Sequence, residues 1–151
     1  MSATDFKPEL IQGVIPEIQD DFSQVGIVVI DHGSRKNASN QLLTELVARF
    51  RARSEYTIVE AAHMEIAAPS LASAIRSCVE QGATTVIIHP YFLAPGRHAS
   101  EDIPMMAREA AAEFPDVNCI VTAPIADHIL MLQVMQDRID QALNNSDSDT
   151  E

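Results

Sequence analysis

Three side chains that bind metal ions well recur at equal intervals along the chain. They are His32, Glu65 and His98, and the two separations are the same (65 − 32 and 98 − 65 both equal 33). This interval matches the length of one strand-helix-strand step. Two imidazoles and one carboxylate suit a divalent first-row metal, and three protein ligands leave coordination positions open for a substrate. The spacing therefore predicts an open metal site at which a reaction takes place.

The elements that would position these residues alternate between two kinds of pattern. Apolar runs rich in β-branched residues predict parallel strands that are covered on both faces, over 25–31, 56–62, 84–89 and 117–122. Apolar residues spaced by three and four predict helices between and after them, over 42–50, 71–79, 105–114 and 129–143. We therefore expect an α/β domain with a four-stranded, mainly parallel sheet and helices on both faces.

The predicted topology brings the three metal-binding candidates to one edge of the sheet. Right-handed crossovers place the carboxyl ends of parallel strands side by side, where ligands usually bind. His32 and Glu65 follow the first and second predicted strands, and His98 follows the third. Gly33 and Gly96 are close by in the sequence and permit close approach of the backbone to a bound molecule. Histidines at strand ends often only satisfy backbone groups, but the coincidence of three candidates on one edge favours the metal site.

The remaining histidines have weaker links to such a site. His63 precedes Glu65 by two residues and shares its face if the strand stays extended, which makes it a second candidate. His89 is expected to serve packing. His128 either caps the last helix or lies at the substrate edge, and Asp127 is also placed to cap that helix.

Composition limits the function classes. The chain has 151 residues, enough for one domain, and 10 basic against 22 acidic residues give a net charge of −12. This charge argues against nucleic acid as a partner. The sequence has no run of ~20 apolar residues that could span a membrane and no secretion signal, so we expect a soluble cytoplasmic protein. Cys78 and Cys119 form no Cys-x-x-Cys pair, which argues against a disulfide framework and a cysteine metal site.

Charge and periodicity divide the chain into three parts. Residues 1–24 are expected to form an acidic N-terminal arm, because Gly13 and Pro16 interrupt any helical period. Residues 25–143 form the predicted α/β domain. Residues 144–151 contain no apolar residue and are expected to be a disordered acidic tail.

Three motifs together resemble those of a known enzyme family. They are Asp-His-Gly-Ser-Arg at 31–35, Ala-His-Met-Glu at 62–65 with Pro-Ser at 69–70, and the segment 90–98 followed by Asp-Ile-Pro at 102–104. This combination resembles the small class II chelatases, which insert a divalent metal into sirohydrochlorin in sirohaem and cobalamin synthesis. The resemblance runs from about Gly26 to Ile139. It is strongest to the plant-type sirohydrochlorin ferrochelatases, so Fe²⁺ is the favoured metal substrate, with Co²⁺ or Ni²⁺ as alternatives.

The resemblance also implies roles for residues. His32, Glu65 and His98 would be the catalytic and metal-binding residues, with the imidazoles holding the metal or taking the pyrrole protons. Substrate-binding residues would be Ser34, Arg35, Gly96 and Arg97, and the positive charges of Arg35, Lys36 and Arg97 would offset the carboxylates of the tetrapyrrole. Single-domain members of the family are homodimers, and the apolar positions of the N-terminal arm could cover such an interface.

Some alternatives stay open from the sequence. The plant-type enzymes carry a C-terminal cysteine segment for an iron-sulfur cluster, and this chain ends without cysteine, so no such cluster is expected. A cobaltochelatase of cobalamin synthesis and a non-catalytic divalent-metal-binding protein are the alternative functions. A phosphohydrolase fits less well, because it leaves Glu65 without a use and the sequence has no Gly-x-x-x-x-Gly-Lys-Ser/Thr phosphate loop.

Overall fold

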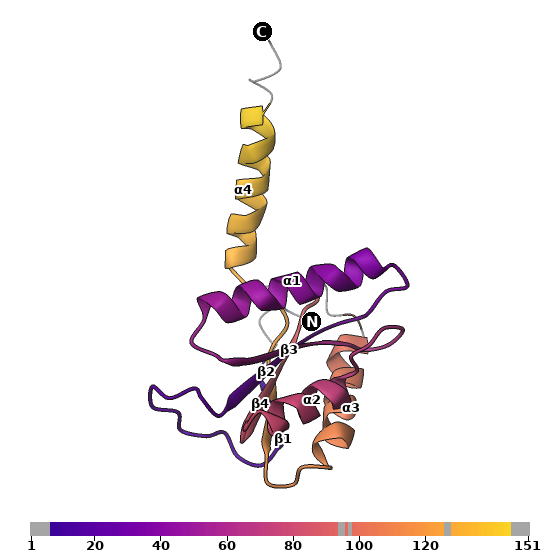
Figure 1. Ribbon diagram of the computed structural model, residues 1–151. Coiled ribbons are helices and arrows are strands. Elements are labelled where there is room, and N and C mark those ends of the chain that lie inside the picture. The colour runs from indigo at the N-terminus through magenta and orange to yellow at the C-terminus, as the bar shows by residue number, and fades with distance from the viewer. Residues whose placement is uncertain (1–6, 94–95, 97, 126–127, 146–151) are drawn as a thin grey trace.

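The fold is that of a computed structural model, which describes residues 7–93, 96, 98–125 and 128–145 (Figure 1). Its five strands are β1 (Glu9–Gln12), β2 (Val25–Asp31), β3 (Ile58–His63), β4 (Thr85–Pro90) and β5 (Asn118–Val121). Its helices are α1 (Asn37–Arg53), α2 (Leu71–Glu80), α3 (Ile103–Ala111) and α4 (Leu130–Asn145), and a π-helical turn, η1 (His98–Asp102), precedes α3.

The strands form one sheet in the order β1-β5-β4-β2-β3. Strands β3, β2, β4 and β5 are parallel, and β1 runs antiparallel to β5 at one edge. The four predicted strands are confirmed, and their ends differ from the predicted ones by at most two residues. The mainly parallel α/β fold expected from the sequence is therefore present, with one additional strand.

The additional strand β1 lies in the segment predicted to be an irregular arm. It is short, and its residues Glu9 and Leu10 are exposed at the sheet edge, so its own sequence carries little hydrophobic pattern. The hydrogen bonds come from elsewhere in the chain: β1 pairs with β5, and Gln12 Nε2 donates to the carbonyl oxygens of Phe114 (2.8 Å) and Val117 (2.9 Å). Sequence periodicity misses a strand that depends on a partner more than 100 residues away.

The hydrophobic core has two layers, one on each face of the sheet. Helices α2 and α3 cover one face, where they pack on alternate strand residues such as Val28 and Ile88. Helix α1 covers part of the other face through Leu43 and Val47, which pack with Ile27 of β2. Both faces of β2 are buried, as its continuous apolar sequence predicted.

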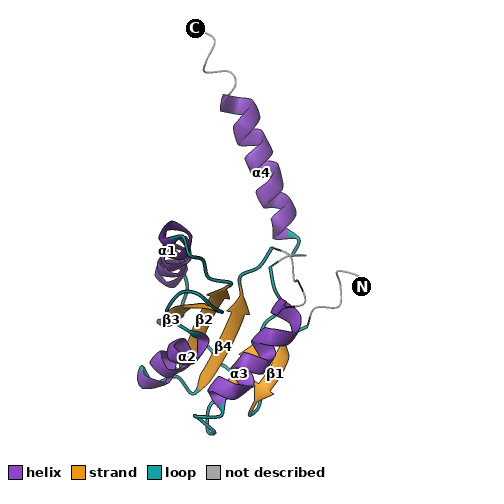
Figure 2. Cartoon of the chain, turned by 90° about the vertical axis from the view of Figure 1, so that its right-hand side faces the viewer, coloured by secondary structure: helices purple, strands orange, loops and turns teal. Residues whose placement is uncertain are grey.

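Helix α4 projects away from the sheet (Figures 1 and 2). Its amphipathic sequence predicted the helix, but the helix runs to Asn145, two residues into the segment expected to be a disordered tail. Its large apolar side chains other than the partly buried Met131 are exposed, with fractions between 46% for Val134 and 64% for Leu143. The Nδ1 atom of His128 accepts a hydrogen bond from the Leu130 amide (3.2 Å), which confirms the capping role considered for this histidine. Asp127, the other predicted cap, lies outside the described residues. Within the described parts of the chain, no helix is long and apolar enough to cross a membrane.

Candidate functional site

The candidate site lies at the carboxyl edge of the three neighbouring strands β4, β2 and β3. In the sheet register, Asp31 at the end of β2 lies opposite His63 at the end of β3, and Ile30 lies opposite Pro90 at the end of β4. His32 therefore follows the central strand of the three, and Glu65 follows β3 two residues after its end. The loop after β4 leads to η1, which begins at His98.

His32 and Glu65 are held next to each other by their main chains. The Glu65 amide donates to the His32 carbonyl oxygen (3.2 Å), and the Met64 amide donates to the Asp31 carbonyl oxygen (2.9 Å). Both His32 and Glu65 are exposed. The His32 ring packs edge-on against Phe92, with ring centroids 4.5 Å apart and an interplanar angle of 72°. The imidazole of His32, supported on one side by Phe92, and the carboxylate of Glu65 are therefore both accessible from solvent.

The third predicted ligand is placed only by its backbone. His98 is the first residue of η1, so its main chain lies in the segment after β4, but its side chain lies outside the described part of the structure. Among the residues whose side chains are described, no group of three or more histidine, cysteine or acidic side chains could hold a metal ion. The structure thus places the backbones of two of the three predicted ligands side by side.

Asp31 and His63, which lie close to these two residues along the chain, form a pair that the sequence did not assign; His63 is buried and Asp31 is partly exposed. The His63 ring is only 2% exposed, and its Nδ1 atom lies 2.5 Å from Asp31 Oδ1. The same carboxylate oxygen accepts a hydrogen bond from the Gly33 amide (2.9 Å). His63, the second candidate ligand from the sequence, is therefore buried and paired with Asp31, whereas His32 is open to solvent. Asp31 belongs to a motif that is visible in the sequence. Its pairing with His63, however, depends on the register of β2 against β3, which the sequence does not show.

Gly33 permits the close approach of the two loops. Its φ of +84° is in the left-handed region, and a Cβ atom at this position would clash with the Glu65 carbonyl oxygen and lie 3.1 Å from His63 Cβ. Gly33 thus permits close approach to another loop of the same chain, whereas its expected approach to a bound molecule stays a prediction.

The loop after His32 supplies positive charge and backbone donors. Ser34 is tied to α1, because its amide donates to Asn40 Oδ1 (2.9 Å) and its carbonyl accepts from Asn40 Nδ2 (2.8 Å). Arg35 and Lys36 are exposed, and α1 begins directly after them without an acidic residue in its first turn. A cationic loop at a helix N-terminus favours anionic groups. Gly96 is exposed, and Arg97 lies outside the described residues.

His89 lines two cavities near the same sheet edge, which goes beyond the packing role predicted for it. One of about 590 Å³ lies against the start of α4, and one of about 240 Å³ lies against α1. Thr122 donates its hydroxyl proton to the Ala123 carbonyl (2.9 Å), so His89 Nδ1 is the donor in the 2.6 Å contact with Thr122 Oγ1. Burial lowers the pKa of His89, so the ring is neutral at neutral pH.

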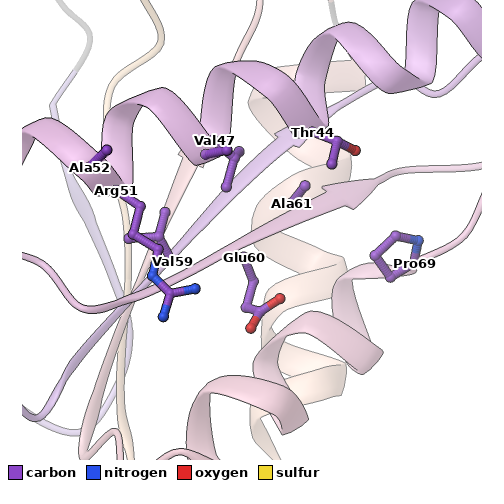
Figure 3. Close-up of a pocket in the computed structure, with 9 residues that line it drawn as sticks. Thr44, Val47, Arg51, Ala52, Val59, Glu60, Ala61 and Pro69 are labelled. Carbon is purple, nitrogen blue, oxygen red and sulfur yellow. The ribbon is translucent and has the colours of Figure 1, made fainter.

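A further cavity, of about 640 Å³, lies between α1 and β3 (Figure 3), and neither His32 nor Glu65 lines it. Its acidic group is Glu60, which already accepts hydrogen bonds from Ser77 Oγ (3.0 Å) and Gln81 Nε2 (2.6 Å) of the α2 region. Its remaining lining is mostly apolar, apart from Thr44 and Arg51. This hollow therefore contains no second set of metal ligands.

The comparisons with known proteins agree with this architecture. Residues 26–142 match the CbiX family, and the chain belongs to that family. The resemblance to small class II chelatases is thereby confirmed. Among its relatives is the chloroplastic sirohydrochlorin ferrochelatase of Arabidopsis thaliana, 45% identical over 126 residues, which cover 83% of this chain and 56% of the relative.

Two other similarities bear on function and fold. A sirohydrochlorin cobaltochelatase of Methanocaldococcus jannaschii is 39% identical over 80 residues, which cover 53% of this chain and 56% of the relative. The crystal structure of a CbiX protein from Marinobacter aquaeolei VT8 superposes with a TM-score of 0.71 at 26% identity, covering 80% of this chain and 98% of that one. The chain thus spans a little over half the length of the two curated relatives.

Proposed function

We propose that this protein is a lyase, a sirohydrochlorin chelatase that inserts a divalent metal, Fe²⁺ by preference, into the tetrapyrrole in sirohaem synthesis. The observation that carries the proposal is the pairing of His32 and Glu65 at the carboxyl edge, beside the segment that begins at His98, in a member of the CbiX family. The metal ion is a substrate in this reaction.

The site offers the groups that metal insertion needs. The metal must exchange water for ring nitrogens while two pyrrole protons leave, and a neutral imidazole with an ordinary pKa of ~6.5 is a suitable acceptor for a proton. In the proposed mechanism His32 and His98 hold the metal or accept the protons, and Glu65 steadies the metal during the exchange. Arg35, Lys36 and Arg97 bind the carboxylates of the tetrapyrrole, together with Ser34 and Gly96 in the same loops.

Iron is the preferred metal because the relative that is 45% identical is a ferrochelatase. Imidazole and carboxylate also bind Co²⁺, and the cobaltochelatase relative makes a role in cobalamin synthesis the second candidate. Burial raises the pKa of Cys78 to about 12 and that of Cys119 to about 11. Protonated, buried thiols are poor cluster ligands, which supports the expectation that neither cysteine holds an iron-sulfur cluster.

A catalytic assay tests the proposal against a protein that only binds metal. Metal-free protein is mixed anaerobically with sirohydrochlorin and Fe²⁺ or Co²⁺, and the change in visible absorption is followed. We expect acceleration by the wild type, none by His98→Ala, and a wild-type rate for Arg76→Ala, which alters an exposed charge paired with Glu113 on the α2–α3 side. Metal binding without acceleration would support the non-catalytic alternative.

We also propose that the protein is a homodimer in which α4 packs on a second copy. The N-terminal segment is the weaker candidate for the interface, because its β1 is already paired with β5. Helix α4 exposes apolar residues, and the cavity of about 240 Å³ beside α1 is lined almost entirely by apolar side chains. Helix α1 has three basic residues against Glu45, and α4 has two acidic residues against Arg138, so the two helices have net charges of opposite sign.

Introduced cysteines test this interface between copies. Val134→Cys on α4 and Phe50→Cys on α1 are made in separate proteins, mixed and oxidised; both positions are exposed, whereas the native cysteines are buried. A mixed disulfide dimer supports the proposal, because neither variant can form the bond within one chain. Absence of that product, together with a monomer mass in sedimentation, would overturn it.

The cytoplasmic location stays a prediction. Its basis is the sequence alone, and the relative from Arabidopsis thaliana is a chloroplastic protein. Cell fractionation with an antibody to this chain tests it, and recovery in an organelle would contradict it.

A further inference from the structure

The carboxylate of Asp31 connects the two loops that carry His32 and Glu65. Its Oδ1 atom accepts the Gly33 amide from the His32 loop (2.9 Å) and faces the His63 Nδ1–H at the end of β3 (2.5 Å). The Asp31 carbonyl oxygen also accepts the Met64 amide (2.9 Å). One residue thus bonds to the chain just after His32 and to the strand end just before Glu65.

This arrangement leaves the two loops little freedom to move apart. His63 is buried, so its ring is fixed by the surrounding core, and its Nδ1–H fixes the position of the Asp31 carboxylate. The carboxylate in turn orients the Gly33 amide, and Gly33 has no room for a Cβ against the Glu65 carbonyl oxygen. A shift of the carboxylate therefore changes the backbone on which His32 and Glu65 are placed.

We propose that Asp31 and His63 are positioning residues, which hold His32 and Glu65 at the spacing required to receive the metal ion before it arrives. The inference rests on the proposed function, because it assumes that His32 and Glu65 meet the metal. Neither Asp31 nor His63 touches the metal in this proposal. Residues that orient metal ligands in this way commonly change metal affinity by about 10–100-fold when they are removed.

Two substitutions at one position separate positioning from packing. Asn places its amide Nδ2–H where His63 has Nδ1–H, so His63→Asn keeps the donor to Asp31. His63→Leu fills a similar volume without a donor. We expect Co²⁺ affinity, measured by calorimetry and by the visible absorption of the bound Co²⁺, to fall about tenfold or more in His63→Leu and to stay within about threefold of wild type in His63→Asn.

A control removes a comparable hydrogen bond from the same strand. Ser77→Ala deletes the contact to Glu60, three residues before His63 and away from the carboxyl edge. We expect it to leave Co²⁺ affinity and the Co²⁺ spectrum unchanged. If His63→Leu does not fold, His63→Gln takes its place, because the longer side chain keeps the polarity but displaces the donor from Asp31.

The outcomes distinguish this inference from the proposed function. Failure of the wild type to bind Co²⁺ would overturn the proposed function. If the wild type binds Co²⁺ and a folded His63→Leu or His63→Gln variant binds it equally well with the same spectrum, the positioning role is overturned. In the chelatase assay the positioning role also predicts a raised KM for the metal in these variants, with recovery in His63→Asn.

Discussion

Substituting Gly33 by alanine tests whether the close approach of the two site loops matters. The φ of +84° strains any residue with a Cβ, at a cost of about 1–2 kcal/mol. The new methyl group must also displace the Glu65 carbonyl oxygen, which is backbone and cannot rotate away. Loss of the hydrogen bond between the Glu65 amide and the His32 carbonyl adds about 1 kcal/mol to this destabilisation.

Gly82 offers a matched control for the backbone strain. Its φ is also positive (+103°), but a Cβ atom there would meet nothing within 4 Å. Gly82→Ala should therefore lower the free energy of unfolding only through backbone strain, by about 1–2 kcal/mol. Gly33→Ala should lower the free energy of unfolding by about 2–3 kcal/mol, which corresponds to a fall in Tm of about 4–12 °C for a chain of this size.

Thermal unfolding and Co²⁺ titration of both variants provide the assay. We expect Gly33→Ala to weaken Co²⁺ binding by about tenfold or more, and Gly82→Ala to leave it unchanged. Equal losses of stability in the two variants, with wild-type Co²⁺ affinity in both, would refute the argument that the loops are in contact through Gly33.

Three further predictions concern groups away from the metal ligands. Burial holds the pKa of His89 below its value in the unfolded chain, so the unfolded chain binds more protons. The free energy of unfolding should therefore fall as the pH drops below about 6.5. Urea unfolding at several pH values should show a smaller fall in His89→Asn than in the wild type. The thiols of Cys78 and Cys119, with pKa values of about 12 and 11, should react with a thiol reagent at pH 8 only after unfolding in guanidinium, and rapid reaction of the folded protein would contradict their burial. Arg76→Ala should change the free energy of unfolding by less than about 1 kcal/mol, because its ion pair with Glu113 is exposed, and the change should shrink further in high salt.

The central strands and the helices could be predicted because their patterns are local. The continuous apolar run of β2 reports burial on both faces, which depends little on the details of the neighbouring strands. Strand β1 escaped prediction because its partner is β5, and its exposed residues show no pattern of their own. The period of α4 predicts a helix with an apolar face, but it carries no information on what lies against that face.

The place of the candidate site in the fold was predictable to the level of the sheet edge. The rule that parallel strands end together was enough to place His32 beside Glu65. The pairing of Asp31 with His63 required the register of β2 against β3, which spacing alone does not define. The burial of His63 was likewise not predicted, because it depends on the same packing of β3 against β2.

The hydrogen bond between the Glu65 amide and the His32 carbonyl has a consequence for redesign. It makes the separation of these two positions a property of the backbone, so donor atoms can be exchanged there one side chain at a time. An engineer who wants a different ion could install a thiolate or a second carboxylate at position 32 or 65 and keep the loops as they are. Changes in loop length, by contrast, would disturb both positions together.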